Sequence, residues 1–280
     1  MNKEFEFFLN SIGDFTLRRR LINIFEFIPK QGSLKILDFG CGEGVYTYAL
    51  NKFTNHKITA LDYDKNIMSN LNNLNLNKDV KKIIIDGEKD TFPFQKNQFD
   101  IIILSEVLEH INDDINLLNK LYKYLNMNGY FIITVPNFYY PISIDPFNGI
   151  RRLCNLGHFN PKNTFLGGMW SYDHKRLYKK DDINRLISCK DFKVVNLVGL
   201  TRYVFPFYYH LIRSAKMFMD KSPNGLISSS LNKFNPKQNF ISKIFKFFYK
   251  IFELVDRFNN NNTNIDLNFV TYFLVLKKTK

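Results

Sequence analysis

The chain has 280 residues, 45% of them hydrophobic, which is enough for one large folded domain with a full core. Three cysteines and no Cys/His cluster at zinc spacing exclude a disulfide framework and a zinc module, and they favour a reducing cytoplasmic setting. The net charge of +13 is concentrated late in the chain, since residues 200–280 hold 13 Lys/Arg against 4 Asp/Glu, and it indicates an anionic surface or ligand there.

Secreted and membrane-spanning proteins do not fit this sequence. The first apolar stretch is interrupted by Glu4 and Glu6, so it is not expected to be a signal peptide. The uncharged run at 131–144 is shorter than the roughly 20 residues that a membrane-spanning helix needs, and it contains two prolines. The expected location is cytoplasmic, and peripheral contact with a membrane surface stays open.

Short apolar strands and helices alternate after an N-terminal helix expected over 5–28. Strands are expected at 35–39, 57–61, 81–85, 100–104, 130–135, 192–198 and 268–277. Helices are expected at 45–52, 66–76, 113–125 and 180–188. Strands that are apolar throughout and separated by helices predict a parallel sheet covered on both faces, which is a doubly wound α/β domain.

We expect three parts along the chain. Residues 1–30 form the N-terminal helix, 31–199 together with 266–280 form the α/β domain, and 200–265 form a basic, aromatic helical insert before the last strand. Residues 137–178 are rich in Pro, Gly and Asn, and we expect them to cover the carboxyl edge of the sheet.

The insert carries an amphipathic pattern at 240–258. Lys243, Lys246 and Lys250 recur on one side, with Glu253 and Arg257, and Phe, Ile and Leu fill a broad opposite face. This pattern is typical of a helix on an anionic lipid surface, but also of a lid packed on its own domain or a dimer partner. All three interpretations stay open on the sequence alone.

The first predicted strand runs into a glycine-rich turn, Asp-Phe-Gly-Cys-Gly-Glu-Gly at 38–44. Ligands of an open α/β sheet bind beyond the carboxyl ends of its strands, and glycines let a ligand approach the backbone closely. A dinucleotide fingerprint would need glycine at position 45, where Val45 stands, and no phosphate-binding lysine follows.

Acidic residues follow the next two strands. Asp62 ends the second strand, where a carboxylate can accept from both hydroxyls of a ribose. Asp86, followed by Gly87, ends the third and can accept from an adenine amine. These ends therefore predict a nucleoside ligand that lacks a pyrophosphate.

These segments resemble the class I S-adenosylmethionine-dependent methyltransferases. Residues 36–44 resemble motif I, 99–110 the fourth-strand motif, and 125–135 the segment leading into the fifth strand. The Glu-Val-Leu-Glu-His form at 106–110 is most similar to the type 11/12 branch that includes the ubiquinone-biosynthesis O-methyltransferases.

The resemblance implies a Rossmann-like seven-stranded sheet of order 3-2-1-4-5-7-6, with the last strand antiparallel, and S-adenosylmethionine as cofactor. The cofactor-binding residues that it implies are Asp38, Gly40, Gly42, Gly44, Asp62, Asp86, Gly87 and Ser105. Methyl transfer from a sulfonium is an in-line displacement, so such an enzyme mainly aligns the reactants and excludes water.

The acceptor side is less defined. His110, His158 and His174 are candidate general bases, of which we favour His110 and His174. Glu106 and Glu109 lie near His110 in the chain and could form a proton relay or a cation site with it, although no metal is expected. Trp170, Asp173, Arg176 and Tyr178 accompany His174 in a polar-aromatic cluster where the family places acceptor contacts.

The expected function is methylation, most simply O-methylation, of a small or lipid-linked acceptor. A first alternative is an RNA methyltransferase whose basic C-terminal region contacts phosphates, although Ser105 and Glu106 differ from the Asn-Pro-Pro-Tyr type used on base amines. A second alternative is a binding protein that keeps the fold without catalysis. Nucleic acid is the less favoured partner, and a homodimer stays open.

Overall fold

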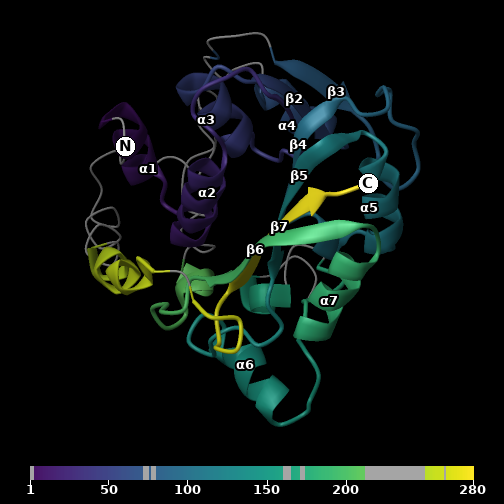
Figure 1. Ribbon diagram of the computed structural model, residues 1–280. Coiled ribbons are helices and arrows are strands. Elements are labelled where there is room, and N and C mark those ends of the chain that lie inside the picture. The colour runs from purple at the N-terminus through teal and green to yellow at the C-terminus, as the bar shows by residue number, and fades with distance from the viewer. Residues whose placement is uncertain are drawn as a thin grey trace.

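In the computed structural model, seven strands form one sheet of order β3-β2-β1-β4-β5-β7-β6 (Figure 1). The structure describes residues 3–71, 76, 80–159, 165–170, 174–211, 250–261 and 263–280. The strands are β1 (Lys35–Phe39), β2 (Lys57–Asp62), β3 (Lys81–Ile84), β4 (Phe99–Ser105), β5 (Leu125–Pro136), β6 (Phe192–Leu200) and β7 (Thr271–Lys278). Only β7 runs antiparallel to its neighbours β5 and β6, so the expected fold class and strand order are confirmed.

Helices cover both faces of the sheet. The α-helices are α1 (Lys3–Ser11), α2 (Phe15–Phe27), α3 (Val45–Phe53), α4 (Lys65–Asn70), α5 (Asp114–Tyr122), α6 (Pro146–Leu153) and α7 (Lys180–Ser188). Short 3-10 helices are η2 (Leu108–His110), η3 (Phe165–Trp170) and η4 (Arg257–Asn259). Successive strand residues point to opposite faces, so Ile36 packs with α1 to α4 and Leu37 packs with α5 and α7.

The N-terminal segment forms two helices, so the single helix predicted over 5–28 is wrong. Asp14 has extended backbone angles and ends the continuity between α1 and α2. Its carboxylate accepts from the amides of Thr16 and Leu17, which makes it the N-cap of α2. The apolar periodicity continued across this break, which is why the pattern read as one helix.

Helix α5 also ends earlier than predicted, at Tyr122, because β5 begins at Leu125. The pairing of β4 with β5 shifts register between Phe99 and Ile101, and Asn128 has a left-handed φ of 63° within the extra segment. The Asn-Gly pair at 128–129 therefore lies in a bulge inside the strand.

The described ends of the insert pack on the N-terminal helices. Tyr208 and Phe252 share a buried apolar cluster with Phe15 of α2. Arg19 of α2 contacts the carboxylate of Asp256 at 2.8 Å. Lys243 and Lys246, on which the lipid-surface interpretation depended, lie outside the described residues. The part of the insert that the structure describes is thus packed against its own chain.

Among the described residues, no helix combines the length and the apolar character that crossing a membrane requires.

Candidate functional site

The glycine-rich turn after β1 is fixed to the end of β2. The amides of Gly40 and Cys41 donate to the carbonyl of Leu61, at 2.8 and 3.0 Å. The amide of Gly42 donates to Oδ2 of Asp62 at 2.9 Å. The turn therefore leads from β1 into the N-terminus of α3 as a curved stretch of backbone beside a carboxylate, a geometry that accepts a polar ligand.

Gly40 and Gly42 of this turn differ in the space that a side chain would have. Gly40 has a φ of 69°, and a Cβ built on it would lie 2.6 Å from Cγ2 of Val107, so packing requires glycine there. Gly42 has a φ of 50°, but a Cβ would meet nothing within 4 Å. The space over Gly42 is therefore open and can receive a ligand against bare backbone.

Asp38 does not face this open space. Its side chain is buried and accepts a hydrogen bond of 2.6 Å from the hydroxyl of Thr47 in α3. Burial raises the pKa of Asp38 to about 6, although the Thr47 hydrogen bonds oppose the shift. Asp38 thus orients the turn relative to α3, and its predicted contact with a cofactor stays a prediction.

Asp62 and Asp86 lie at neighbouring strand ends, as predicted from the sequence. Asp62 accepts from Gly42 through Oδ2 and from the Asp64 amide through Oδ1, and each oxygen keeps a second lone pair for a ligand. Asp86 is more exposed and contacts Lys89 at 2.8 Å. A hydrogen bond from Lys89 lowers the pKa of Asp86. Gly87 lies against the ring of Phe39, which leaves no room for a Cβ.

Ser105, at the end of β4, belongs to a chain of polar contacts. Its hydroxyl donates to the Tyr46 hydroxyl at 2.8 Å and lies 2.9 Å from that of Thr134 in β5. Thr134 in turn donates to Oε1 of Glu106 at 3.2 Å. The other oxygen of Glu106 contacts the guanidinium of Arg20 at 3.0 Å. We call these five residues the Arg20 network.

Arg20 and Tyr46 were missed by the sequence analysis. Both come from helices, α2 and α3, whose side chains reach the end of β4 only through packing. Although burial lowers it, the pKa of Arg20 is raised on balance by the charge of Glu106 and by Tyr46, so the guanidinium keeps its charge. Its buried Nε–H has no acceptor among the described residues. Such an orphaned donor fits a ligand that brings a carboxylate.

A second group of side chains lies just beyond β4. Glu109, His110 and His174 each offer a ligand atom, and these atoms lie within 4.8 Å of one another. The two imidazole rings are 4.9 Å apart between centroids. We call this group the Glu109 cluster. It brings together the two histidines that the sequence analysis favoured, from segments 64 residues apart.

The burial of the Glu109 cluster determines its chemistry. Glu109 is fully buried, and neither carboxylate oxygen has a hydrogen-bond partner among the described residues. Burial, and secondly the charge of Glu106, raises the pKa of Glu109. Nδ1 of His174 lies 2.8 Å from the carbonyl of Met169, so Nδ1 carries the proton and Nε2 keeps its lone pair. Burial and the neighbouring His110 lower the pKa of His174 to about 3.

The other predicted acceptor residues are occupied elsewhere or lie outside the cluster. His158 stacks on Trp170 with ring centroids 3.7 Å apart. The hydroxyl of Tyr178 donates to Asp114 at 2.8 Å, and Arg176 contacts the same carboxylate at 2.9 Å, a buried structural arrangement. Asp173 lies outside the described residues.

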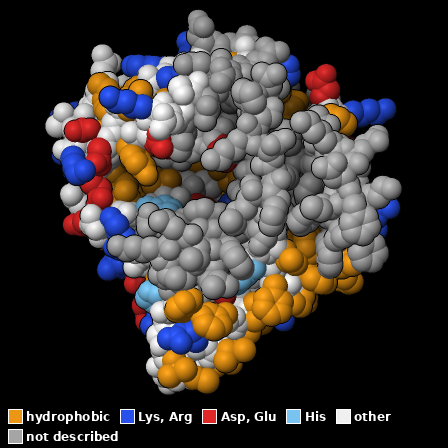
Figure 2. Space-filling view, turned by 180° about the vertical axis from the view of Figure 1, so that it is seen from behind, with side chains coloured by type: hydrophobic (Ala, Val, Ile, Leu, Met, Phe, Trp, Pro, Cys, Tyr) orange, Lys and Arg blue, Asp and Glu red, His pale blue; other side chains and the backbone are white. Residues whose placement is uncertain are grey.

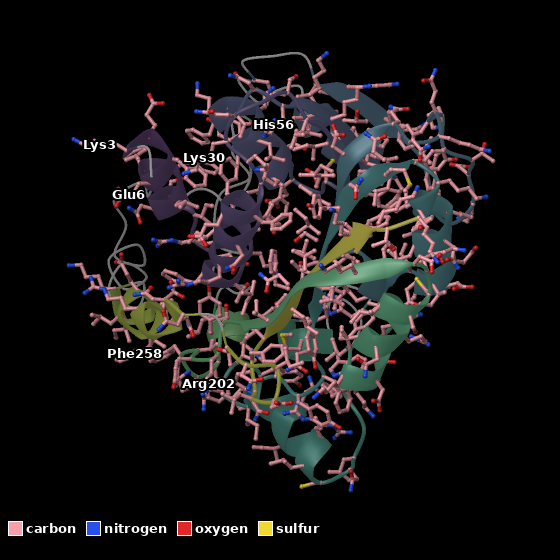
Figure 3. All side chains as sticks on the ribbon, viewed as in Figure 1. Lys3, Glu6, Lys30, His56, Arg202 and Phe258 are labelled. Carbon is pink, nitrogen blue, oxygen red and sulfur yellow. The ribbon has the colours of Figure 1, made fainter. Side chains whose placement is uncertain are left out.

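His56 lies before β2, at the opposite edge of the sheet (Figure 3). Nδ1 of His56 accepts from the Leu34 amide at 3.2 Å, and Nε2 lies 2.7 Å from the Pro29 carbonyl. With both ring nitrogens engaged by backbone, His56 is a structural residue.

Residues 37–133 match the family model described as a methyltransferase domain. The mouse protein named mitochondrial arginine-hydroxylase NDUFAF5 is 31% identical over 96 residues, which are 34% of this chain and 27% of that protein. A demethylmenaquinone methyltransferase of Lactococcus lactis is 28% identical over 100 residues, or 34% of this chain and 39% of that protein. The matched segment thus spans less than half the length of these curated relatives.

Solved structures support the fold across the chain. A structure described as an S-adenosylmethionine-dependent methyltransferase of Archaeoglobus fulgidus superposes with a TM-score of 0.55 at 15% identity, covering 99% of this chain and 100% of that one. The [4+2]-cyclase SpnF superposes with a TM-score of 0.54 at 12% identity, covering 93% and 80%. Residues 37–133 thus match a methyltransferase domain, and the strand order gives the chain the fold of the S-adenosylmethionine-dependent methyltransferase structure to which it is similar.

Proposed function

We propose that this protein transfers a methyl group to a hydroxyl oxygen of a small or lipid-linked acceptor. The observation that carries the proposal is the Glu109 cluster, which offers a lone pair on His174 and a buried carboxylate without a hydrogen-bond donor among the described residues, next to the carboxyl end of β4. A hydroxyl acceptor must lose its proton during methylation, and this cluster offers groups that can receive the proton or hold a cation.

Three features on the cofactor side of the site support binding of S-adenosylmethionine. The open backbone at Gly42 would take the nucleoside, and Asp62 its ribose hydroxyls. Arg20, whose Nε–H lacks an acceptor among the described residues, would take the carboxylate of the methionine part. When bound, the cofactor supplies a methyl group already activated by a positively charged sulfur.

The acceptor side supports a cation role for the Glu109 cluster more than a simple proton relay. A histidine with a pKa of about 3 takes up a proton poorly at neutral pH, but it stays neutral, as metal coordination requires. A buried carboxylate is stabilised in its charged form by a nearby cation. Two imidazoles and one carboxylate suit a divalent transition metal or zinc, which would lower the pKa of the acceptor hydroxyl.

The experiment also has to distinguish the two alternative functions that the sequence left open, an RNA methyltransferase and a binding protein without catalysis. An RNA acceptor is supported only by basic residues in 200–280, many of which lie outside the described residues. A protein that binds without catalysis would leave the Glu109 cluster without a role. The name of the mouse relative refers to hydroxylation, so the assay also has to detect oxygen insertion.

The deciding experiment offers deuterium-methyl-labelled cofactor together with separate metabolite, lipid and RNA extracts, and follows the label by mass spectrometry. We expect label on an oxygen in the metabolite or lipid fraction. Label confined to nucleosides of the RNA hydrolysate, or added oxygen without label, contradicts the proposal. No transfer combined with calorimetric binding of the cofactor would indicate the binding protein.

Matched variants locate the acceptor chemistry. His174→Gln should lower kcat at least tenfold while cofactor affinity, measured by calorimetry, is unchanged. His158→Gln removes a histidine outside the Glu109 cluster and should leave kcat unaltered. Treatment with a chelator followed by re-addition of divalent cations separates the two roles, because a proton relay is insensitive to both.

A further inference from the structure

Several exposed apolar side chains lie close together on and after helix α6. Phe147, Ile150 and Leu153 are 47%, 56% and 67% exposed, and Leu156 and Phe159 are 60% and 36% exposed. We call these five residues the apolar tip. Helix α6 projects at the lower end of the molecule in Figure 1, and Figure 2 shows hydrophobic side chains gathered at that end around a Lys/Arg group.

The apolar tip is one contiguous surface. Phe147, Ile150 and Leu153 recur every three residues, so they lie along one side of α6. The rings of Phe147 and Phe159 are in edge contact, with centroids 5.2 Å apart. Arg151 lies 5.9 Å over the Phe147 ring and donates to the carbonyl of Leu156 at 2.8 Å, which holds the following turn against the helix.

The base of the apolar tip is rigid. The carboxylate of Asp145 caps α6 by accepting from the amide of Asn148 at 3.2 Å. Arg152 donates to the carbonyls of Phe138 and Tyr140 and lies over the Tyr140 ring. The exposed side chains are therefore presented on a fixed support, and ordering them on a partner costs little entropy.

The charge around the apolar tip has one sign. Within the described residues 146–159, the charged side chains are Arg151 and Arg152, and the preceding Asp145 is fully buried. A short amphipathic helix with aromatic and aliphatic side chains on one side and cations beside them binds the interface of an anionic bilayer. We propose that the apolar tip docks this protein on an anionic lipid surface.

The size and shape of the apolar tip favour lipid over a second copy of the chain. Each partner in a stable dimer buries about 800 Å², whereas one eight-residue helix and the turn after it present a patch of a few hundred Å². The tip also projects, and a fluid bilayer accepts projecting side chains where a folded partner would need a matching groove.

The apolar tip lies on the same edge of the sheet as the site. It follows the carboxyl end of β5, and Asp145 accepts from the Met169 amide at 2.9 Å. The carbonyl of Met169 holds His174 in turn. Docking through the tip would bring the Glu109 cluster toward the bilayer, from which a lipid-linked acceptor could enter. The docking itself does not rest on methyl transfer, because vesicle binding is measured without cofactor.

The test is flotation of the full chain with vesicles of phosphatidylglycerol or of phosphatidylcholine. We expect binding to phosphatidylglycerol that weakens with salt, and little binding to phosphatidylcholine. The double variant Ile150→Ser, Leu153→Ser should bind at least tenfold more weakly. Arg151→Glu, which keeps the apolar side chains, should also weaken binding.

The matched control changes two comparably exposed apolar residues of the insert, Leu254→Ser with Phe258→Ser, which are 55% and 74% exposed. Phe258 is labelled in Figure 3. This variant should bind like the parent. The proposal is overturned if the parent does not float with phosphatidylglycerol, if the tip variants bind like the parent, or if only the insert variant loses binding. It is also overturned if light scattering shows a dimer that the tip variants dissociate, since the occupant would then be a second copy.

Discussion

Because the space over Gly42 is open, the substitution Gly42→Ala should affect the free energy of unfolding and the affinity for the cofactor by different amounts. In Gly42→Ala the new Cβ meets nothing within 4 Å, so its cost to folding is the left-handed backbone at a φ of 50°. That cost is about 1–2 kcal/mol for a residue with a side chain. If the cofactor lies against this backbone, the methyl group occupies its place and the dissociation constant should rise at least tenfold, about 1.4 kcal/mol.

Substitutions at two further glycines are the controls for this prediction. Gly32, in the loop before β1, has a φ of 99° and equally free surroundings, so Gly32→Ala should cost a similar amount of stability and leave cofactor binding unchanged. Gly40→Ala adds the clash with Val107 to the backbone cost, for a total of about 2–5 kcal/mol. Of the three variants, Gly40→Ala should therefore be the least stable because of its packing, whereas Gly42→Ala should bind the cofactor more weakly than Gly32→Ala because of its place at the ligand site.

Urea unfolding gives the free energies of unfolding, and isothermal calorimetry gives the affinity for S-adenosylmethionine. The reasoning is refuted if Gly42→Ala binds the cofactor as tightly as Gly32→Ala does. It is also refuted if Gly40→Ala is no less stable than Gly42→Ala, because the contact with Val107 would then carry no weight.

Three other predictions concern stability. Burial raises the pKa of Asp38 from 3.8 to about 6, so the fold favours the protonated acid, and its contribution, full below about pH 4, is lost as the pH rises through 6. The parent should thus lose about 2 kcal/mol of stability relative to Asp38→Asn between pH 4 and pH 6 in urea titrations, and the same pH dependence of stability in both proteins would contradict this. Arg20→Met leaves Glu106 without its cationic partner and should cost about 2 kcal/mol, most of it recovered when Glu106→Gln is added in the same thermal unfolding series. Asp14→Ala removes the N-cap of α2 and should cost about 1 kcal/mol, whereas an unchanged Tm would rule the cap out.

The parts of the fold that could be predicted from sequence are those that local patterns encode. The apolar runs at β1 and β2 and the helix α7 stand within one residue of their predicted ranges, because burial on both faces leaves a continuous apolar signal. The break at Asp14 and the bulge at Asn128 were missed, since a capping contact and a register shift depend on partners that the pattern does not name.

The candidate site likewise contains residues that could be predicted from the sequence and residues that could not. Its glycine turn and the acids Asp62 and Asp86 are at strand ends that the sequence marks directly, because parallel strands bring their carboxyl ends to one edge. Arg20 and Tyr46 carry no such mark. They lie on amphipathic helices, and which of their polar side chains turns toward the sheet edge follows from the packing of α2 and α3.

The sequence alone predicted the order of the seven strands, the strand ends at which a ligand is expected and the chemical class of that ligand, because these depend on residue type and spacing along the chain. Only the tertiary structure decided that Asp38 faces α3, that Glu109, buried without a hydrogen-bond partner among the described residues, meets His174, and that α6 exposes its apolar side chains. Those outcomes depend on contacts between segments far apart in the chain, where burial and the choice of partner, more than residue type, set the charge and the exposure of each group.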